Sequence, residues 1–217
     1  MNHNSQIKTM RAERKESRIR KRQIAEAALG LIARKGMKGL SLAAVAEKVG
    51  VVPSALYRHY RGKEAILEAT LGLIRQLILE NIQTVRGRSA SPLGQLKLLM
   101  ERHLQMIQEF QAIPRIVFSD ELSDDGKPGR TAVYKIIRGL LREVSRIIAK
   151  GQEQGQIKVD LDPKALSVVF LGLVQPPVIL WYLSQGRFDI QGHMKKAWPM
   201  FEQLVKPPSP EKVRRLS

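Results

Sequence analysis

The stretch SLAAVAEKVGVVPSALYRHY, residues 41–60, has the layout of two short helices joined by a turn. Its first half carries apolar residues at the spacing of one helix face, and Ser41 precedes them as a candidate N-cap. Gly50 can form the turn, and Pro53 can open the second helix because the N–H that proline lacks has no helical partner there. Leu56 can then fill the angle between the helices. The stretch therefore predicts a helix-turn-helix.

The second of these helices has an outward face suited to DNA. If Leu56 and Tyr60 point inward, the remaining side chains point outward, as the first turns of a helix in the major groove do. Serine can bond to base edges, alanine can contact a thymine methyl group, and arginine can bind guanine or phosphate. Tyrosine and histidine can donate to phosphate oxygens, and lysine adds positive charge. The candidate DNA contacts are Pro53, Ser54, Ala55, Tyr57, Arg58, His59 and Lys63.

The charge of the chain is concentrated near this segment. The 217 residues carry a net charge of +17. Residues 1–63 hold 15 Lys and Arg against 4 Asp and Glu, a net +11, which leaves +6 for the other 154 residues. Such an excess favours a polyanionic partner. A basic N-terminal arm could instead solubilise the chain or adhere to a membrane, Tyr57 could be a ring at the edge of the core, and His59 could be solvated.

Several functional classes lack their residues in this sequence. There is no cysteine, which excludes a disulfide framework, a Cys-ligated zinc site and a thiol nucleophile. No phosphate-binding loop, dinucleotide glycine pattern or metal-ligand spacing occurs, and the four histidines are dispersed. The apolar run at 165–183 is interrupted by Gln175, Pro176 and Pro177, which favours a buried helix. We expect a cytoplasmic protein that is not an enzyme, with no cofactor, metal or membrane partner.

Helical periodicity dominates the chain, so we expect an all-α fold of about nine helices. The expected organisation is a basic disordered arm over 1–17, a helix-turn-helix DNA-binding domain over 18–65, an effector-binding and dimerisation domain over 66–206 and a flexible tail over 207–217. In this arrangement the helix from Pro53 ends at Gly62 and a long helix covers 63–85. The later helices are expected at 92–110, 112–122, 129–152, 163–184 and 190–205.

Residues 20–70 resemble the DNA-binding head of the TetR family of bacterial transcription regulators. The resemblance covers about a quarter of the chain, and its motifs are specific in combination. The matching residues are Ile24, Ala27, Leu31 and Gly36, then Leu42, Val45, Ala46, Val49, Gly50 and Val51, then Leu56, Tyr57 and Tyr60, and finally Lys63, Glu64, Ile66 and Leu67.

The resemblance implies an all-helical homodimer with a three-helix head, a connecting fourth helix and a variable body that binds an effector. It implies that Pro53, Ser54 and Ala55 read bases and that Tyr57, His59 and Lys63 contact phosphates, whereas Arg58 falls at a variable position. It also implies that Ser41 and Ala43, at the start of the preceding helix, touch the DNA backbone or an adjacent base.

Two departures from the family pattern affect DNA readout. Position 52, usually a capping Ser or Thr, is Val52, which offers no side-chain cap, and Pro53 can compensate by presetting φ. Few of the predicted base readers can form hydrogen bonds. Readout is therefore expected to depend on Arg58, on methyl contacts, on DNA shape and on the basic arm at Arg11–Arg22.

The body offers a predicted dimer interface and a predicted effector pocket. Helices over 163–184 and 192–206 fall where the family forms a four-helix dimer interface, and a stripe of large apolar side chains agrees with that role. Pro176–Pro177 should kink the first of these helices beside a hydrophobic pocket. The predicted interface residues are Leu166, Phe170, Leu173, Trp198 and Phe201. The predicted pocket residues are Met106, Phe110, Phe118, Tyr134, Phe170, Gln175 and Trp181, each of which could instead be ordinary core.

These observations favour a sequence-specific DNA-binding transcriptional regulator, a repressor released from a palindromic operator by a small hydrophobic effector. Its expected partners are double-stranded DNA, a second copy of the chain and that effector. The alternative is an architectural or cell-division DNA-binding factor with the same head and no effector.

Overall fold

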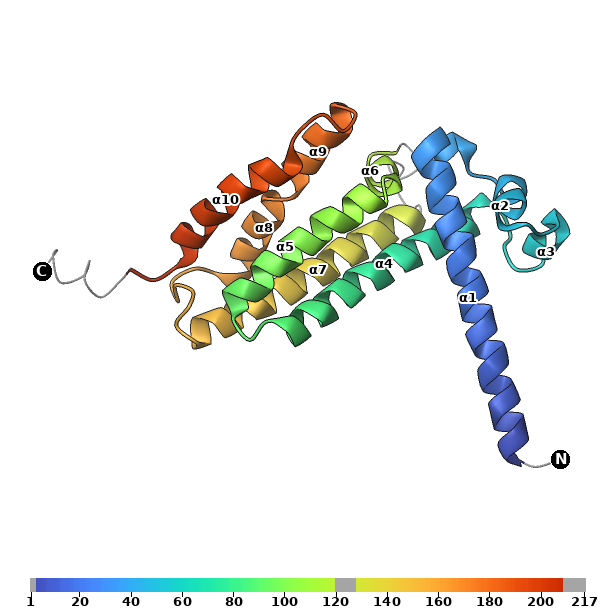
Figure 1. Cartoon of the computed structure of the whole chain (residues 1–217), viewed down its shortest axis with the longest axis horizontal. Coiled ribbons are helices and arrows are strands. Elements are labelled where there is room, and N and C mark those ends of the chain that lie inside the picture. Colours follow the sequence, from blue (N-terminus) through green and yellow to red (C-terminus); the bar gives the residue numbers. More distant parts are fainter. Residues whose placement is uncertain (1–2, 120–127, 209–217) are drawn as a thin grey trace, which may run out of the picture. The chain divides into compact units, whose positions relative to one another are not determined.

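The computed structural model describes residues 3–119 and 128–208, and within these ranges the side chains from Lys15 onward. The described part contains ten α-helices, one 3-10 turn and no strand, so the prediction of an all-α fold with an N-terminal helix-turn-helix head is confirmed (Figure 1). The elements are α1 (His3–Lys35), η1 (Met37–Gly39), α2 (Leu42–Val49), α3 (Pro53–Tyr57), α4 (Lys63–Arg88), α5 (Pro92–Glu109), α6 (Ala112–Val117), α7 (Pro128–Glu153), α8 (Pro163–Gly172), α9 (Gln175–Leu183) and α10 (Ile190–Val205).

The helices form two compact units. The first holds the chain up to Gln76 together with Phe110–Tyr134, and the second holds Leu77–Glu109 together with the chain from Lys135. The N-terminal part of α4 therefore belongs to the first unit and its C-terminal part to the second.

The core of the first unit forms where α1 packs against α2 and α6. The buried side chains of α1 recur at helical spacing from Ile24 to Ile32, and α2 packs in turn against α3. The Ser41 side chain accepts a hydrogen bond from the Ala44 N–H at 3.1 Å and caps α2, as predicted. Gly50 ends α2 with φ 74°, a left-handed conformation that glycine adopts without a steric cost.

The core of the second unit is formed by aliphatic side chains of α5 and α7 and by aromatic side chains of α8 and α10. Leu96, Leu104 and Ile148 are fully buried. The rings of Phe170 and Phe201 meet edge to face with centroids 5.9 Å apart, and Trp198 lies 5.7 Å from Phe201. These aromatic contacts hold α8 against α10 within a single chain.

Three helix boundaries differ from the predictions. α1 begins at His3, although residues 1–17 were expected to be disordered, because the stretch contains strong helix formers and neither Gly nor Pro before Gly30. α3 ends at Tyr57 and not at Gly62, since the next residues turn so that Tyr60 becomes buried. α6 ends at Val117, short of the predicted 122. Most of the predicted tail, from Ser209 onward, lies outside the described residues.

The predicted kink at Pro176–Pro177 is a complete break. α8 ends at Gly172 and α9 begins at Gln175, with the two prolines in its first turn. The N–H groups of Leu173 and Val174 bond to carbonyls three residues back, at 3.1 and 3.0 Å, which tightens the chain between the helices. The physical cause is that neither proline can donate a helical hydrogen bond.

Candidate nucleic-acid interface

The short helix α3 separates its side chains into a buried and an exposed set. Leu56 is buried and so is Tyr60 just after the helix, as predicted. Burial also raises the pKa of Tyr60, so its hydroxyl stays neutral in the physiological range. Of the predicted DNA contacts here, Ala55 is half-buried; Pro53, Ser54, Tyr57, Arg58 and His59 are exposed.

The remaining predicted contacts flank α3. Ser41 and Ala43 are exposed at the start of α2, which packs against α3, and Lys63 is half-buried as the first residue of α4. The Ser41 oxygen already accepts from Ala44, so its hydroxyl hydrogen remains for donation to a phosphate. The nine predicted residues thus lie at the N-cap and first turn of α2, on α3 and the two residues after it, and at the start of α4. Their contact with DNA stays a prediction.

A cleft of about 840 Å³ adjoins this surface. One wall is the exposed stretch of α1 that includes Arg20 and Lys21, and the other contains His59, Tyr60 and the first turns of α4. The run of cations at residues 18–22 was the sequence signal for this place, whereas the extension of the same helix back to His3 was not foreseen.

The predicted effector residues are not assembled around one described cavity. Phe110, Phe118 and Tyr134 belong to the first unit, and Phe118 and Tyr134 are mostly exposed. The other four, Met106, Phe170, Gln175 and Trp181, belong to the second unit, where the first two are buried. The Met106 sulfur lies 3.8 Å from the amide nitrogen of Asn81 on α4, an ordinary core contact. Their role as a pocket stays a prediction.

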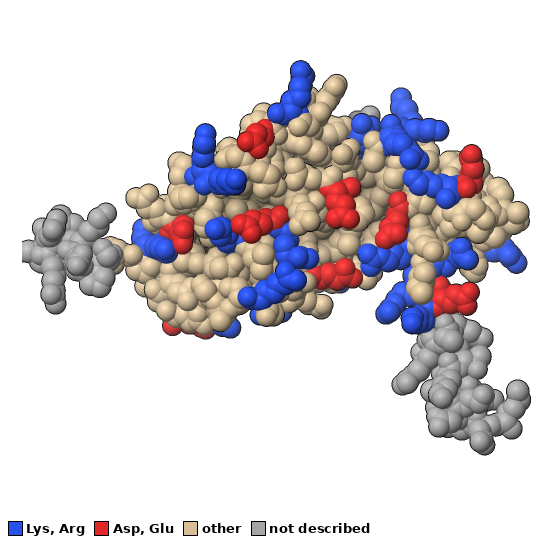
Figure 2. Space-filling view, in the orientation of Figure 1, with Lys and Arg blue, Asp and Glu red and all other residues tan. Residues whose placement is uncertain are grey.

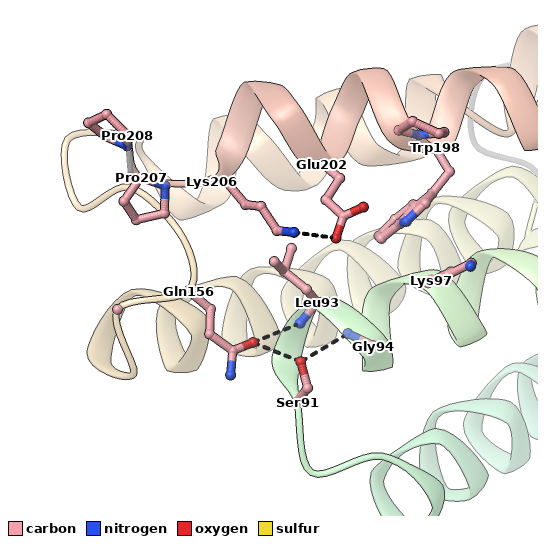
Figure 3. Close-up of a pocket in the computed structure, with 12 residues that line it drawn as sticks. Ser91, Leu93, Gly94, Lys97, Gln156, Trp198, Glu202, Lys206, Pro207 and Pro208 are labelled. Carbon is pink, nitrogen blue, oxygen red and sulfur yellow. Dashed lines mark hydrogen bonds and ion pairs between the residues drawn. The ribbon is translucent and has the colours of Figure 1, made fainter. Parts of the chain in front are cut away.

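A hollow of about 680 Å³ lies in the second unit, and none of the predicted effector residues lines it (Figure 3). Trp198, Lys97 and the Lys206–Glu202 ion pair, 2.9 Å long, contribute to its wall. At the start of α5, Ser91 donates to the Gln156 side-chain oxygen at 2.8 Å. Ser91, Gln156, Glu202 and Lys206 are thus bonded to one another in pairs within the second unit.

The predicted interface residues are mostly interior in the single chain. Leu166, Phe170, Trp198 and Phe201 are buried, and Leu173 is half-buried. Within the single chain Phe170 of α8 packs against Phe201 of α10. Whether the five residues take part in pairing stays a prediction. The same helices and α9 expose a different apolar set: Val168, Val169, Leu180, Leu183, Met200 and Leu204.

Part of this exposed apolar set lies in a strongly apolar stretch of the sequence. The stretch Pro163–Leu183 is apolar and long enough to cross a membrane, although α8 and α9 are separate helices, and only 33% of its most apolar window is buried. Exposed apolar side chains that gather in one place often mark a surface that binds a partner.

His103 on α5 is a buried titratable residue. Burial lowers its pKa to about 4, so the imidazole is neutral near pH 7. Among the residues described, no three His, Cys, Asp or Glu side chains are grouped so that they could hold a metal ion.

Comparison with known proteins accounts for most of the chain. Residues 24–70 match the family described as bacterial regulatory proteins, tetR family, and residues 71–206 match the YsiA-like protein, C-terminal region. The fatty acid metabolism regulator protein of Bacillus subtilis (strain 168) is 23% identical over 176 residues, which are 81% of this chain and 90% of that protein. The nucleoid occlusion factor SlmA of Actinobacillus pleuropneumoniae serotype 5b (strain L20) is 21% identical over 197 residues, 90% of this chain and 97% of that protein.

A solved structure has the same fold. The transcriptional regulator FadR from Bacillus subtilis, in complex with stearoyl-CoA, aligns with a TM-score of 0.69 at 22% identity. The alignment covers 82% of this chain and 96% of that one. The fold likeness extends through both the head and the body.

Proposed function

Because the chain belongs to the tetR family of bacterial regulatory proteins, we propose that it is a sequence-specific DNA-binding repressor released from its operator by a hydrophobic effector. The observation that carries the proposal is that α3 and the residues just after it have one buried side and one exposed side. Leu56 and Tyr60 fix the segment to the core, while Ser54, Tyr57 and Arg58 remain exposed for a major groove.

Each side chain on this surface has its own task in the proposal. Ser54 and Arg58 contact base edges, since a hydroxyl and a guanidinium can bond to groove acceptors. Tyr57, His59 and Lys63 donate to phosphates and set the register of the helix on the duplex. Ala55, which is half-buried, contributes at most a methyl contact.

The operator is proposed to be a pseudo-palindrome bound by a homodimer. The exposed apolar side chains of α8, α9 and α10 support pairing, because a second copy would cover them. A two-fold dimer places its two α3 helices in successive major grooves, about 34–36 Å apart. The protein acts in the cytoplasm in this proposal, since its target is chromosomal DNA.

The effector is proposed to bind in the body and to shift α4, which changes the spacing of the two heads. A ligand can do this only if its affinity differs between the two spacings. The complex of the Bacillus subtilis regulator with stearoyl-CoA supports an effector with a long apolar chain. The apolar bias of the predicted pocket residues is consistent with that class.

A gel-shift titration tests the proposal. Duplex fragments selected by the purified full chain from its own genome are titrated with stearoyl-CoA, and with free coenzyme A as the matched control lacking the acyl chain. Preference for selected over random duplex together with release by the acyl form alone supports the proposal. No preference for any duplex at low ionic strength, with or without the ligands, contradicts it.

The second candidate is an architectural DNA-binding factor without an effector. It is favoured by the similarity to the nucleoid occlusion factor SlmA over 90% of this chain. Sequence-specific occupancy of many genomic sites, with no release by acyl ligands, is the result that supports this candidate over the first.

A further inference from the structure

The first helix extends far beyond the head that it helps to form. α1 begins at His3, and among its described side chains every residue from Lys15 to Gln23 is exposed and Ile24 is the first that is buried. At 1.5 Å per residue, the part before Ile24 is about 30 Å long. Figure 1 shows this part projecting from the head as a single helix.

The projecting part is strongly basic. Residues 3–22 contain eight Lys and Arg and two Glu. Figure 2 shows Lys and Arg side chains gathered on the described stretch of this projection, where Lys15, Arg18, Arg20 and Lys21 are exposed. Arg22 is engaged locally by Glu26 at 2.9 Å.

The side chains of the stretch Lys15–Gln23 fit a nucleic acid better than a lipid surface or a partner helix. Ile19 is the large apolar side chain that is exposed between Lys15 and Gln23, so this stretch has no apolar face to enter a lipid surface or to form a coiled coil. Cations without an apolar face fit a highly charged and hydrophilic polyanion.

The projection is continuous with the predicted DNA surface. Arg20 and Lys21 line the same cleft as His59, which we propose contacts a phosphate, and the carboxylates of Glu16 and Glu68 also line it. Arg20 and Lys21 therefore lie near the phosphate that His59 is proposed to bind. The family match begins at residue 24, so the projecting part lies outside the matched head.

We infer that the exposed stretch Lys15–Gln23 of α1 is a second DNA-binding surface, which contacts phosphates beside the segment read by α3. The inference rests on the proposed DNA-binding function and extends it. In this inference the contacts are made by cations to the backbone and are sequence-independent, which differs from the part in readout expected of the arm from the sequence. They lengthen the bound duplex and increase the salt dependence of binding.

The test uses three full-length variants that keep helix-forming residues in α1. The first is Lys15→Gln/Arg18→Gln/Lys21→Gln, which removes three exposed cations. The second, Lys15→Arg/Arg18→Lys/Lys21→Arg, keeps the charge at the same positions. The third, Lys97→Gln/Arg142→Gln/Lys150→Gln, removes three exposed cations from the second unit and matches the change in net charge.

Binding to a selected duplex is measured across a salt series, with and without added flanking base pairs. Each lost phosphate contact makes the slope of log Kobs against log salt less steep by about 0.9. In the first variant the magnitude of the slope is therefore expected to fall by about 2.7 for each bound chain. When the salt is raised from roughly 50 to 200 mM, the first variant should therefore lose about 40-fold less affinity than the wild type loses. The other two variants should keep the wild-type slope, and the first should no longer gain affinity from the flanks.

Two results overturn the inference. The first is a slope that changes by less than one unit in the α1 variant, or by the same amount in the second-unit variant. The second is loss of binding to phosphatidylglycerol vesicles in the α1 variant while its DNA slope is unchanged, which would assign the surface to a membrane. In both cases a retained preference for the selected duplex shows that the proposed function stands; absence of any preference shows that the proposed function has failed.

Discussion

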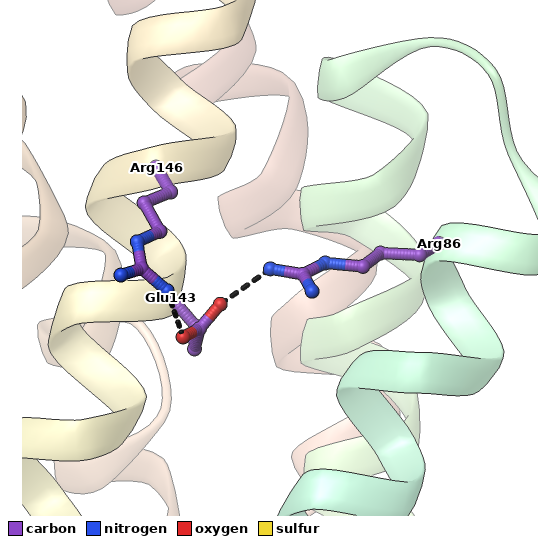
Figure 4. A network of polar contacts seen from close by, with 3 residues as sticks. All are labelled: Arg86, Glu143 and Arg146. Atoms are coloured by element: carbon purple, nitrogen blue, oxygen red, sulfur yellow. Dashed lines mark hydrogen bonds and ion pairs between the residues drawn. The ribbon is translucent and has the colours of Figure 1, made fainter.

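Arg86, in the last turn of α4, forms an ion pair with Glu143 of α7 within the second unit (Figure 4). The same carboxylate accepts a hydrogen bond from Arg146 at 2.6 Å, so one acidic group holds two guanidinium groups. Glu143 is 14% exposed, whereas both arginines are at least half exposed. The pair therefore ties the C-terminal end of the connecting helix to the body.

A double-mutant cycle on this pair should give a measurable coupling. Arg86→Gln and Glu143→Gln are each expected to lower the free energy of unfolding by up to about 1 kcal/mol, the usual limit for a partly exposed pair. The double variant should lose less than the sum of the two. Urea denaturation measures the three differences, and simple additivity would show that the pair contributes nothing. Arg146→Gln, an exposed i,i+3 partner, is the control and should cost less.

Adding the missing cap to α3 should stabilise the head. Val52 occupies the N-cap position with φ −68° and ψ 140°, but it makes no side-chain hydrogen bond, and it is 65% exposed. Val52→Thr supplies a hydroxyl that can accept from an N–H in the first turn, so we expect a gain of about 1 kcal/mol. Thermal denaturation measures the gain. Val52→Ala should bring none, and equal stability of the two variants would argue against a capping effect.

DNA-binding experiments should distinguish the proposed phosphate contacts from the proposed base contacts. Lys63→Ala should weaken binding to all duplexes alike and lower the salt slope by about one for each head. Tyr57→Phe should also weaken binding regardless of sequence, since only the hydroxyl is lost. Arg58→Ala should change which sequences are selected from a random pool. An unchanged preference would place Arg58 among the phosphate contacts.

Charge placed on the exposed apolar surface should prevent pairing. Met200 is 71% exposed and Leu204 52% exposed on α10, so Met200→Lys/Leu204→Lys leaves the core intact while opposing burial against a second copy. Light scattering should give the mass of one chain for this variant and of two for the wild type. Val159→Lys, at an 80% exposed loop position, should remain paired. If the double variant still has the mass of two chains, the interface does not include Met200 and Leu204.

The buried imidazole of His103 should make the protein sensitive to acid. Its pKa falls from 6.5 to about 4 on folding, so between these pH values the unfolded chain binds a proton that the folded chain does not. Stability should therefore fall as the pH drops from about 6.5 to 4, by up to about 3 kcal/mol. Denaturation of His103→Gln at several pH values should show a smaller slope, while the exposed-site control His193→Gln should match the wild type.

The local features of the head could be predicted because they depend on neighbouring residues. Ser41 caps α2, Gly50 adopts a positive φ, and Pro53 opens α3, each for a reason that a few adjacent positions determine. Leu56 and Tyr60 could be assigned inward from spacing alone. The early end of α3 could not be foreseen, since no proline or glycine marks it, and the burial of Tyr60 decides it.

The faces of the body helices could not be predicted in the same way. α8 is apolar on several sides, so its sequence does not reveal that Phe170 points inward while Val168 and Val169 remain exposed. That division depends on α10, which supplies Phe201 from a distant part of the chain. The effector residues were harder still, since an apolar side chain such as Met106 serves equally in a core and in a cavity.

The edge-to-face contact of Phe170 and Phe201 within one subunit has a consequence for gene dosage. This contact lies inside one chain and does not require a second copy. We therefore expect the proposed homodimer to associate reversibly in dilute solution, and occupancy of its proposed two-half-site operator to rise with roughly the square of the subunit level whenever monomers predominate. Expression of the proposed target genes should then respond to synthesis of the regulator more steeply than binding by a single subunit would allow.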